Sequence, residues 1–455
     1  MVTENFPQRI KTIKEIEVLS PRSVIYVMSR DQRVSDNLAL FAAQRYALKK
    51  KLPLIVLFVL QPVSRVRAKQ HFSFMLEGLD DVSRRLADYG IPFVIEVGKK
   101  EDVITRIMLE FSPAAFFFDF SPLNGQKTLL QKMSRHYVSL YVVDTHNIVP
   151  VCVASSKQEW AARTLRPKIH KQLLDYAKDE FQLVQQKHTL SAPTILPTSL
   201  LEAVTVTELE NYIPKIAPGR QEAEKLLEDF LERKLMSYAE SRNDPTIEGQ
   251  SNLSAYLHFG TLSSREIIMK ILKEYGSDSD SWPEGVQAFI EEIVVRKELS
   301  DNFCYYNSHY MSLEGAPDWA KKTLVSHSKD KRKIIYSCRE LESAMTHDES
   351  WNAAQTELLR TGKMHGYMRM YWAKKVLEWT ETPSEAVKIL VYLNDKYHLD
   401  GYDPNGYVGI LWSVAGLHDR PWFERRIYGT VRYMNESGLR RKFDLEKYLK
   451  AWIKK

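Results

Sequence analysis

Five short apolar runs in the first third of the chain constrain its fold more than any other feature. Each run is five to seven residues long, and an amphipathic stretch separates it from the next. Continuous apolarity at this length is typical of strands buried on both faces. Alternation of such strands with helices predicts a doubly wound parallel α/β domain over residues 20–150. The runs are SVIYVM (23–28), LIVLFVL (54–60), FVIEV (93–97), AFFFDF (115–120) and VSLYVV (138–143).

The predicted sheet carries neither of the two common phosphate-binding signatures. No GxGxxG follows the first apolar run, and GxxxxGK[ST] occurs nowhere in the chain. The glycines of these motifs let backbone N–H groups approach a phosphate closely. We therefore expect no dinucleotide site or P-loop of the usual kind in this domain.

Beyond residue 219 the apolar period lengthens to the 3.6 residues of a helix. This change predicts an all-helical domain over residues 219–455. Residues 151–218 begin with a helical stretch and continue rich in Pro, Thr and isolated apolar residues, so we expect a long interdomain connection there. The clearest helical patterns cover 221–242, 285–306, 361–382 and 383–399.

Charge is distributed unevenly along the 455 residues. Lys and Arg outnumber Asp and Glu by six overall. The segment 416–455 alone holds eleven basic and five acidic residues, which accounts for the whole excess. A local basic surface favours a polyanionic partner, although a solvated helical tail would give the same count.

The remaining composition points to a soluble cytoplasmic protein. The three cysteines lie far apart and form no CxxC, so we expect reduced thiols and no bound metal. No window approaches the roughly 18 apolar residues of a membrane span. The N-terminal stretch also lacks the apolar core and cleavage site of a secretory signal.

Several residues in the helical region stand out. Trp372 and Trp379 are two helical turns apart, about 10 Å, which suits both electron hopping and core packing. Glu292, Arg369 and Asp400 are charges in apolar surroundings, so each is either an exposed ion-pair member or a polar group facing a cavity. The turn at 251–254, with two serines, is either a helix cap or a phosphate site.

Seven motifs occur along the chain: MSRDQRVSDN (28–37), DFSPL (119–123), SNLSAYLHFG (251–260), FIEEIVVRKELSDNF (289–303), GKMHGYMRMYWAKK (362–375), DGYDPNG (400–406) and GLHDRPWFERRIYGTVRYMN (416–435). Through them the whole chain from about residue 20 to 450 resembles class II cyclobutane pyrimidine dimer photolyases of the photolyase/cryptochrome family. Departures are small: Lys297 replaces a second Arg, Tyr428 and Thr430 stand where Phe and Lys are common, and Val27 stands where many members have an aromatic residue. These seven motifs occur in the family's order and together span most of the chain.

The resemblance implies that the helical domain binds FAD, which is active as FADH⁻. Arg369 and Asp400 would form an ion pair beside the isoalloxazine ring. Asn394 would face flavin N5, since Gly406 occupies the more familiar photolyase position for that amide. The implied cofactor-binding residues are Tyr238, Ser251, Asn252, Leu253, Ser254, Arg296, Arg369, Asn394, Asp400, Gly401 and Asp403. A second antenna chromophore, namely a deazaflavin, a folate or a flavin, is implied only for some members, and its contacts cannot be mapped.

The resemblance also implies light-driven repair of ultraviolet-damaged DNA by a monomer. An electron from photoexcited FADH⁻ would split the cyclobutane ring of the flipped-out dimer and then return. Glu292, Met370, Asn394 and Trp412 would act at the dimer, and Trp372, Trp351 and Trp379 would form the photoreduction chain, in that order outward. The implied DNA contacts are Arg242, Asn243, Arg296, Trp412, Trp422, Arg425, Arg432, Arg440 and Arg441.

Three other interpretations are weighed against this one. A cryptochrome-type blue-light receptor would share the fold, but Glu292, Met370 and Trp412 and the lack of a long extension after Lys455 speak against it. A (6-4) photolyase is also disfavoured, because His258 and His365 lie in different motifs and do not match its histidine pair. An unrelated α/β enzyme fused to a helical adaptor would bind no flavin.

Overall fold

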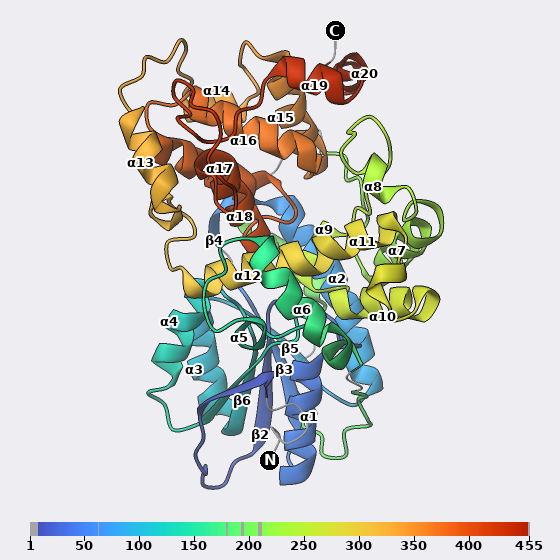
Figure 1. Ribbon diagram of the computed structural model, residues 1–455. Helices are drawn as coiled ribbons and strands as arrows, with labels where there is room; N and C mark the ends of the chain where they lie inside the picture. Colours follow the sequence, from blue (N-terminus) through green and yellow to red (C-terminus); the bar gives the residue numbers. More distant parts are fainter. Residues whose placement is uncertain (1–7, 62, 179–180, 193–194, 208–211, 454–455) are drawn as a thin grey trace.

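The computed structural model describes residues 8–453 apart from 62, 179–180, 193–194 and 208–211. An α/β part lies at the bottom of Figure 1 and a helical part lies above it. The main sheet has the strand order β1-β7-β6-β2-β3-β5, and every pairing in it is parallel except that of β1 with β7. A small second sheet pairs β4 with β8. The strands are β1 Ile10–Lys14, β2 Ser23–Met28, β3 Leu54–Leu60, β4 Val63–Ala68, β5 Phe93–Val97, β6 Pro113–Asp119, β7 Ser139–Val143 and β8 Thr205–Thr207.

The five apolar runs form the five parallel strands of the main sheet, which confirms the doubly wound fold. β2, β3 and β5 have the predicted bounds, and every residue of β2, β3, β6 and β7 is buried. β1 was not predicted. Its sequence, IKTIK, is mostly exposed or half-buried, because an antiparallel edge strand covers only one side of its neighbour. The sheet therefore extends to the N-terminal side of residue 20.

Helices cover both faces of the sheet and continue into the connection. Pro167 lies inside α6, the helix predicted at the start of residues 151–218. The proposed domain limits at 150 and 218 stay a prediction. The helices of this half are α1 Leu38–Lys50, α2 Lys69–Asp88, α3 Lys100–Phe111, α4 Asn124–Met133, α5 Val151–Ala154, α6 Ala162–Ala177 and the 3₁₀ turn η1 Pro197–Ala203.

From residue 220 onward the described chain contains helices joined by loops and no strand, and its one β pairing is an isolated bridge between Arg425 and Gly429. The four predicted helical patterns all contain helices. These are α7 Arg220–Arg233, α8 Tyr238–Ser241, α9 Ser254–Phe259, α10 Ser264–Tyr275, η2 Ser279–Ser281, α11 Glu284–Ile290, the π-helical turn η3 Glu291–Arg296, α12 Lys297–Tyr306, η4 Leu313–Gly315, α13 Asp318–Ser326, α14 Cys338–Glu342, α15 Glu349–Thr361, α16 Gly366–Glu378, α17 Pro383–Tyr397, α18 Pro404–Ala415, α19 Glu436–Lys442 and α20 Leu445–Trp452.

The helical part is divided between two hydrophobic cores. Helices α7 to α11 share a core with one face of the sheet, through side chains such as Phe230, Phe289 and Ile290. Helices α15 to α18 enclose a second core that begins at Phe303 and contains Trp351. The long helical run α11–η3–α12 passes from the first core to the second. The two helical groups are therefore separate packing units on either side of this run.

The carboxyl ends of β2 and β6 adjoin the helical part. Open α/β sheets usually bind ligands in the crevice at this kind of switch point. Here Asp119, at the end of β6, accepts hydrogen bonds from the backbone N–H groups of Ser29, Arg30 and Asp31 at 2.7, 2.9 and 3.1 Å. Arg30 then donates both terminal nitrogens to Asp301 of α12, at 2.6 and 2.8 Å. These hydrogen bonds attach the α/β part to the helical part through the turn that follows β2.

Candidate functional site

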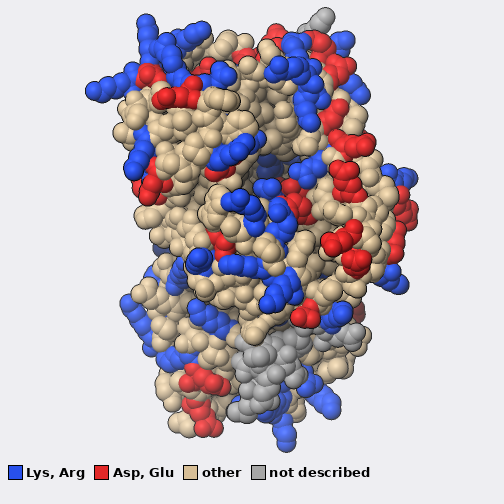
Figure 2. Space-filling view, in the orientation of Figure 1, with Lys and Arg blue, Asp and Glu red and all other residues tan. Residues whose placement is uncertain are grey.

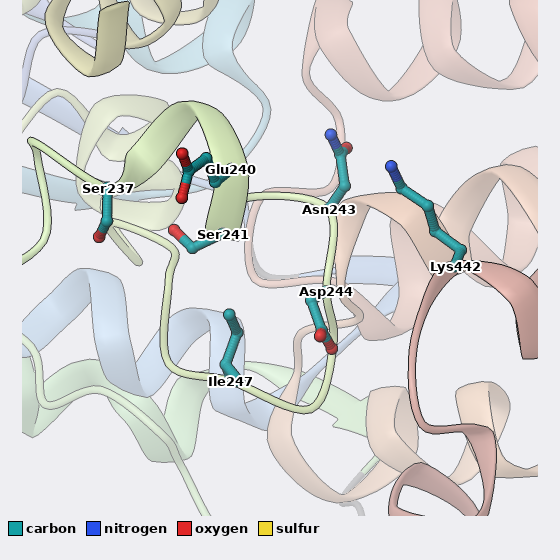
Figure 3. A pocket seen from close by; sticks show the side chains of 7 residues that line it. All are labelled: Ser237, Glu240, Ser241, Asn243, Asp244, Ile247 and Lys442. Atoms are coloured by element: carbon teal, nitrogen blue, oxygen red, sulfur yellow. The ribbon is translucent and has the colours of Figure 1, made fainter.

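A hollow opens between the two helical groups, and Lys and Arg side chains gather around it (Figure 2). At one side of this region the structure contains a cavity of about 360 Å³. Lys442 of α19 extends toward Asn243 across this cavity, so both helical groups contribute to its wall (Figure 3). The lining residues are Ser237, Glu240, Ser241, Asn243, Asp244, Ile247 and Lys442.

Arg369 and Asp400 form the ion pair that the sequence predicts. The Arg369 guanidinium donates to Asp400 Oδ1 at 2.7 Å and to His398 Nδ1 at 2.8 Å. Burial alone would raise the pKa of Asp400, but the neighbouring guanidinium outweighs it and holds that pKa well below its usual range. Burial and the same guanidinium lower the pKa of His398. The group is therefore Arg⁺, carboxylate and neutral imidazole, with His398 Nε2 unpartnered among the described residues.

The serine turn lies near the same charges. Asn252 adopts the left-handed conformation with φ of +57°, and its side-chain oxygen accepts a hydrogen bond from Lys363 Nζ. Burial lowers the pKa of Lys363 to about 8. His365, two residues on, caps α16 through Nδ1, while its Nε2 has no partner in the described part of the chain. Burial lowers the pKa of His365 to about 4, so Nε2 carries an N–H that is available to a ligand.

Asn394 and Gly406 meet between α17 and α18. Asn394 is 3% exposed and donates to Asp395 Oδ1 at 2.9 Å. A Cβ on Gly406 would lie 2.8 Å from Asn394 Nδ2 and 3.2 Å from Oδ1. The amide from α17 therefore fills the space that a side chain on α18 would otherwise take. Asp403, which begins α18, is held by His258 Nδ1 at 3.1 Å.

Glu292 lies on η3, where the π-helical turn displaces the chain from regular α geometry. Its carboxylate accepts a hydrogen bond from Arg242 at 2.8 Å, and both side chains are about one third exposed. The Arg242 guanidinium also lies 5.6 Å from the ring centre of Tyr238. Burial, with a contribution from Glu292, raises the pKa of Tyr238 to about 12. These three residues bring α8 and η3 together at the open side of the site.

The three tryptophans of the predicted electron chain are in contact. The rings of Trp372 and Trp351 stack at 6.3 Å with an interplanar angle of 11°, and Trp351 meets Trp379 edge-on at 5.7 Å. All three are at most 3% exposed. Trp379 in turn contacts Tyr336 at 5.4 Å, and the Tyr336 hydroxyl bonds His347 Nδ1 at 2.7 Å. The aromatic series thus continues from the buried tryptophans to the exposed His347.

Trp412 belongs to a ladder of alternating cations and aromatic rings. The order is Lys374, Trp412, Arg432, Trp422 and Arg420, with cation-to-ring-centre distances of 5.2, 5.6, 4.2 and 5.6 Å. Lys374 is fully buried, and burial lowers its pKa to about 7. At the other end Trp422 is 37% exposed. The ladder therefore leads from the core to the surface.

The other predicted contact residues differ in how exposed they are and in which residues they pair with. Arg296 is about half exposed and pairs with Glu291 at 3.0 Å, so in this structure it faces solvent and Glu291. Arg425 lies over the Tyr433 ring at 5.0 Å. Arg440 is paired with two glutamates at 2.7 Å each, which offsets its charge. Met370 is half-buried, Gly401 is buried, and Arg441 is exposed on α19.

Comparison with known proteins identifies the family. A family profile described as DNA photolyase matches residues 24–188. A deoxyribodipyrimidine photo-lyase of Potorous tridactylus is 42% identical over 97% of this chain and 84% of its own length. One of Arabidopsis thaliana is 40% identical over 94% of this chain and 88% of its own length, and one of Methanothermobacter thermautotrophicus is 39% identical over 94% and 93%. The chain belongs to the DNA photolyase family.

Solved structures share the fold at lower sequence identity. A class III photolyase of Agrobacterium tumefaciens superposes with a TM-score of 0.68 at 20% identity, over 95% of this chain and 87% of that one. A cryptochrome of Synechocystis gives 0.71 at 15% identity, over 96% and 89%. These matches confirm the predicted α/β-plus-helical architecture. No helix in the part of the chain that the structure describes is both long enough and apolar enough to span a membrane.

Sequence reasoning missed four polar or aromatic residues of the site region. Lys363 and His365 stand inside a quoted motif, but only the fold shows that Lys363 reaches Asn252, 111 residues earlier. Nothing in the sequence marks His398 as a site residue except its place two residues before Asp400. Tyr336 lies in an unremarkable polar stretch, and three helices, α14 to α16, separate it in sequence from its partner Trp379.

Proposed function

We propose that this chain is a class II photolyase that splits cyclobutane pyrimidine dimers in DNA under blue light. The observation that carries this proposal is the juxtaposition in one region of the Arg369–Asp400 pair, the Asn394 amide at Gly406 and a contiguous tryptophan series. The curated relatives named deoxyribodipyrimidine photo-lyase, at about 40% identity over most of the chain, support the same activity.

The residues present fit FAD as the cofactor. Two buried imidazole nitrogens, of His365 and His398, lack partners in the described structure, which is expected where a polar ligand belongs. Lys363 and Arg369 would hold the anionic groups of the cofactor, and Asn252 with the Ser251–Ser254 turn would hold its diphosphate. Asn394 would orient the ring edge. When bound, FAD supplies light absorption and a single transferable electron.

The chain's own side chains would then act on the lesion. Glu292 would exchange its hydrogen bond with Arg242 for one to a pyrimidine carbonyl or N3–H, which stabilises charge arriving on the dimer. Trp412 and Met370 would pack against the extruded bases and exclude water. Trp372, Trp351 and Trp379 would carry electrons inward from the surface when the cofactor needs reduction. Two of these indoles are held in place by hydrogen bonds to neutral acceptors. The Trp372 N–H donates to the Gln355 side chain, and the Trp351 N–H donates to the Trp372 carbonyl.

DNA would bind to the basic surface around the hollow. Arg242, Asn243, Trp422, Arg425, Arg432, Arg440 and Arg441 are the proposed contacts, without sequence readout because most would meet phosphates. We expect a monomer. A second chromophore, if bound, would transfer excitation to FAD, and a relative of known structure from Sulfolobus tokodaii is described with two FAD molecules.

The deciding experiment exposes purified, reduced protein and ultraviolet-irradiated oligothymidine to blue light or darkness. Thymine absorbance is lost on dimer formation and returns on splitting, so recovery in light alone supports the proposal. No recovery with flavin bound would favour a photoreceptor, and no recovery without flavin would contradict the whole assignment. Glu292→Ala should lower repair yield while flavin stays bound, whereas the exposed Glu284→Ala on α11 should not.

A further inference from the structure

An exposed tryptophan stands beside the loop that carries the outer end of the cation–aromatic ladder. Trp160 precedes α6 and is 52% exposed. Its flanking residues Glu159 and Ala161 are buried, and the Glu159 N–H donates to Asn302 of α12 at 2.8 Å. The indole is therefore held outward by a fixed backbone, and its exposure is a property of the fold.

A second attachment joins Trp160 to the 416–420 turn. The Trp160 carbonyl accepts a hydrogen bond from His418 Nδ1 at 2.7 Å. Burial lowers the pKa of His418 to about 4, so this imidazole is neutral and Nδ1 is the protonated nitrogen. His418 also contacts Phe303 edge-on at 5.8 Å. Trp160 is thus attached to the turn that also carries Arg420, the last cation of the ladder.

The charges around Trp160 are those that attract a polyanion. The Arg163 guanidinium lies 5.0 Å from the indole centre and has no carboxylate partner among the described residues. Farther along α6, Arg166 shares Glu291 with Arg296, so two cations are balanced by one carboxylate. The buried Glu159 is already neutralised by Lys168 at 2.5 Å. In Figure 2, Lys and Arg side chains continue below the hollow over the region where Figure 1 draws α6.

We infer that Trp160 and Arg163 form a docking site for an unpaired nucleotide of the DNA strand outside the lesion pocket. One indole face is covered by Arg163, and the other would stack a base, while the guanidinium would bind the adjacent phosphate. Stacking tolerates any base, which suits an enzyme that must act regardless of sequence. The inference rests on the proposed function, because a DNA strand whose lesion lies in the pocket is what would present such a nucleotide.

Variants at the two residues test the site. Trp160→Ala should weaken binding of a long oligothymidine about tenfold, the usual effect of losing one stacked base, and Trp160→Phe should retain most of the affinity. Arg163→Ser should lower the slope of log affinity against log salt by about one, as for one lost phosphate contact. Arg84→Ser, on the exposed surface of α2, is the matched control and should leave both unchanged. DNA binding should also quench a fluorescence component that Trp160→Phe removes.

A thymine dinucleotide dimer, which has no flanking nucleotides, distinguishes this site from the lesion pocket. Trp160→Ala should repair the dinucleotide as well as the wild-type protein does, while it loses affinity for the long strand. Unchanged affinity for the long strand, or an equal loss on both substrates, would overturn the inference. If the wild-type protein repairs no dimer, the proposed function fails, but a selective loss of long-strand binding in Trp160→Ala would still identify a nucleic-acid site.

Discussion

The Asn394 side-chain nitrogen lies 2.8 Å from the point where a Cβ on Gly406 would stand. The Asn394 amide on α17 thus needs a glycine at position 406 on α18 to make room for it. The two positions form one unit although they lie on different helices.

Gly406→Ala should displace the Asn394 amide, because the added methyl would overlap it. We expect a loss of about 1–3 kcal/mol in the free energy of unfolding and weaker retention of flavin. Gly409→Ala is the control on the same helix, since a Cβ there meets nothing within 4 Å. That variant should gain up to about 1 kcal/mol from helix propensity. Thermal unfolding and the flavin-to-protein ratio measure both effects, and equal behaviour of the two variants would contradict the steric relationship.

Trp351→Phe should interrupt the aromatic series at its middle member. Photoreduction of oxidised flavin should become much slower, while pre-reduced protein should still repair dimers. Trp282→Phe is a matched change, because Trp282 is 4% exposed and donates its indole N–H to the Gly276 carbonyl at 3.0 Å, away from the series. Both variants should lose about 1–3 kcal/mol of stability, so only the photoreduction rate separates them. Normal photoreduction in Trp351→Phe would show that electrons take another route.

Arg30→Met should leave Asp301 as an unpaired charge between the two parts of the protein. Asp301 is fully buried, so we expect a loss of about 3–5 kcal/mol in the free energy of unfolding. Arg85→Met removes an arginine from the exposed pair with Asp81 and should cost less than about 1 kcal/mol. The double variant Arg30→Met/Asp301→Leu should recover much of the loss. Denaturant unfolding gives the three values, and a small effect of Arg30→Met would mean that water replaces the ion pair.

His327 should make stability depend on pH. Hydrogen bonds to Asp330 at 2.6 Å and Glu424 at 2.9 Å raise its pKa above 6.5, so the folded state favours the imidazolium. The contribution to stability is complete below pH 6.5 and disappears as the pH rises through the raised value. His327→Gln should abolish this dependence. The stability difference between wild type and variant should therefore shrink with rising pH, and a constant difference would exclude the linkage.

The sheet was readable from sequence because strands buried on both faces leave continuous apolar runs. β1 was missed for the opposite reason, since an edge strand with polar residues has no such signature. Asn394 could be named only through resemblance to a family. Its close approach to Gly406 is visible only in the folded structure, and its role stays a prediction. Lys363 and Tyr336 were not predicted as site residues. Their partners, Asn252 and Trp379, are distant in sequence, and no periodicity connects either residue with its partner.

The division of the helical half into two cores was equally invisible, because both groups have the same 3.6-residue period. What separates them is the partner each packs against: the sheet for α7 to α11, and one another for α15 to α18. Periodicity identifies an apolar face, but it does not identify what covers that face.

The attachment at the ends of β2 and β6 has a consequence for how the protein responds to heat. Asp119 fixes the turn that follows β2, and Arg30 of that turn donates to Asp301 on α12. Because this turn cannot loosen without breaking a buried ion pair, the α/β part and the helical part should unfold together. One cooperative melting transition is therefore expected for the whole chain, in place of a separate transition for each part.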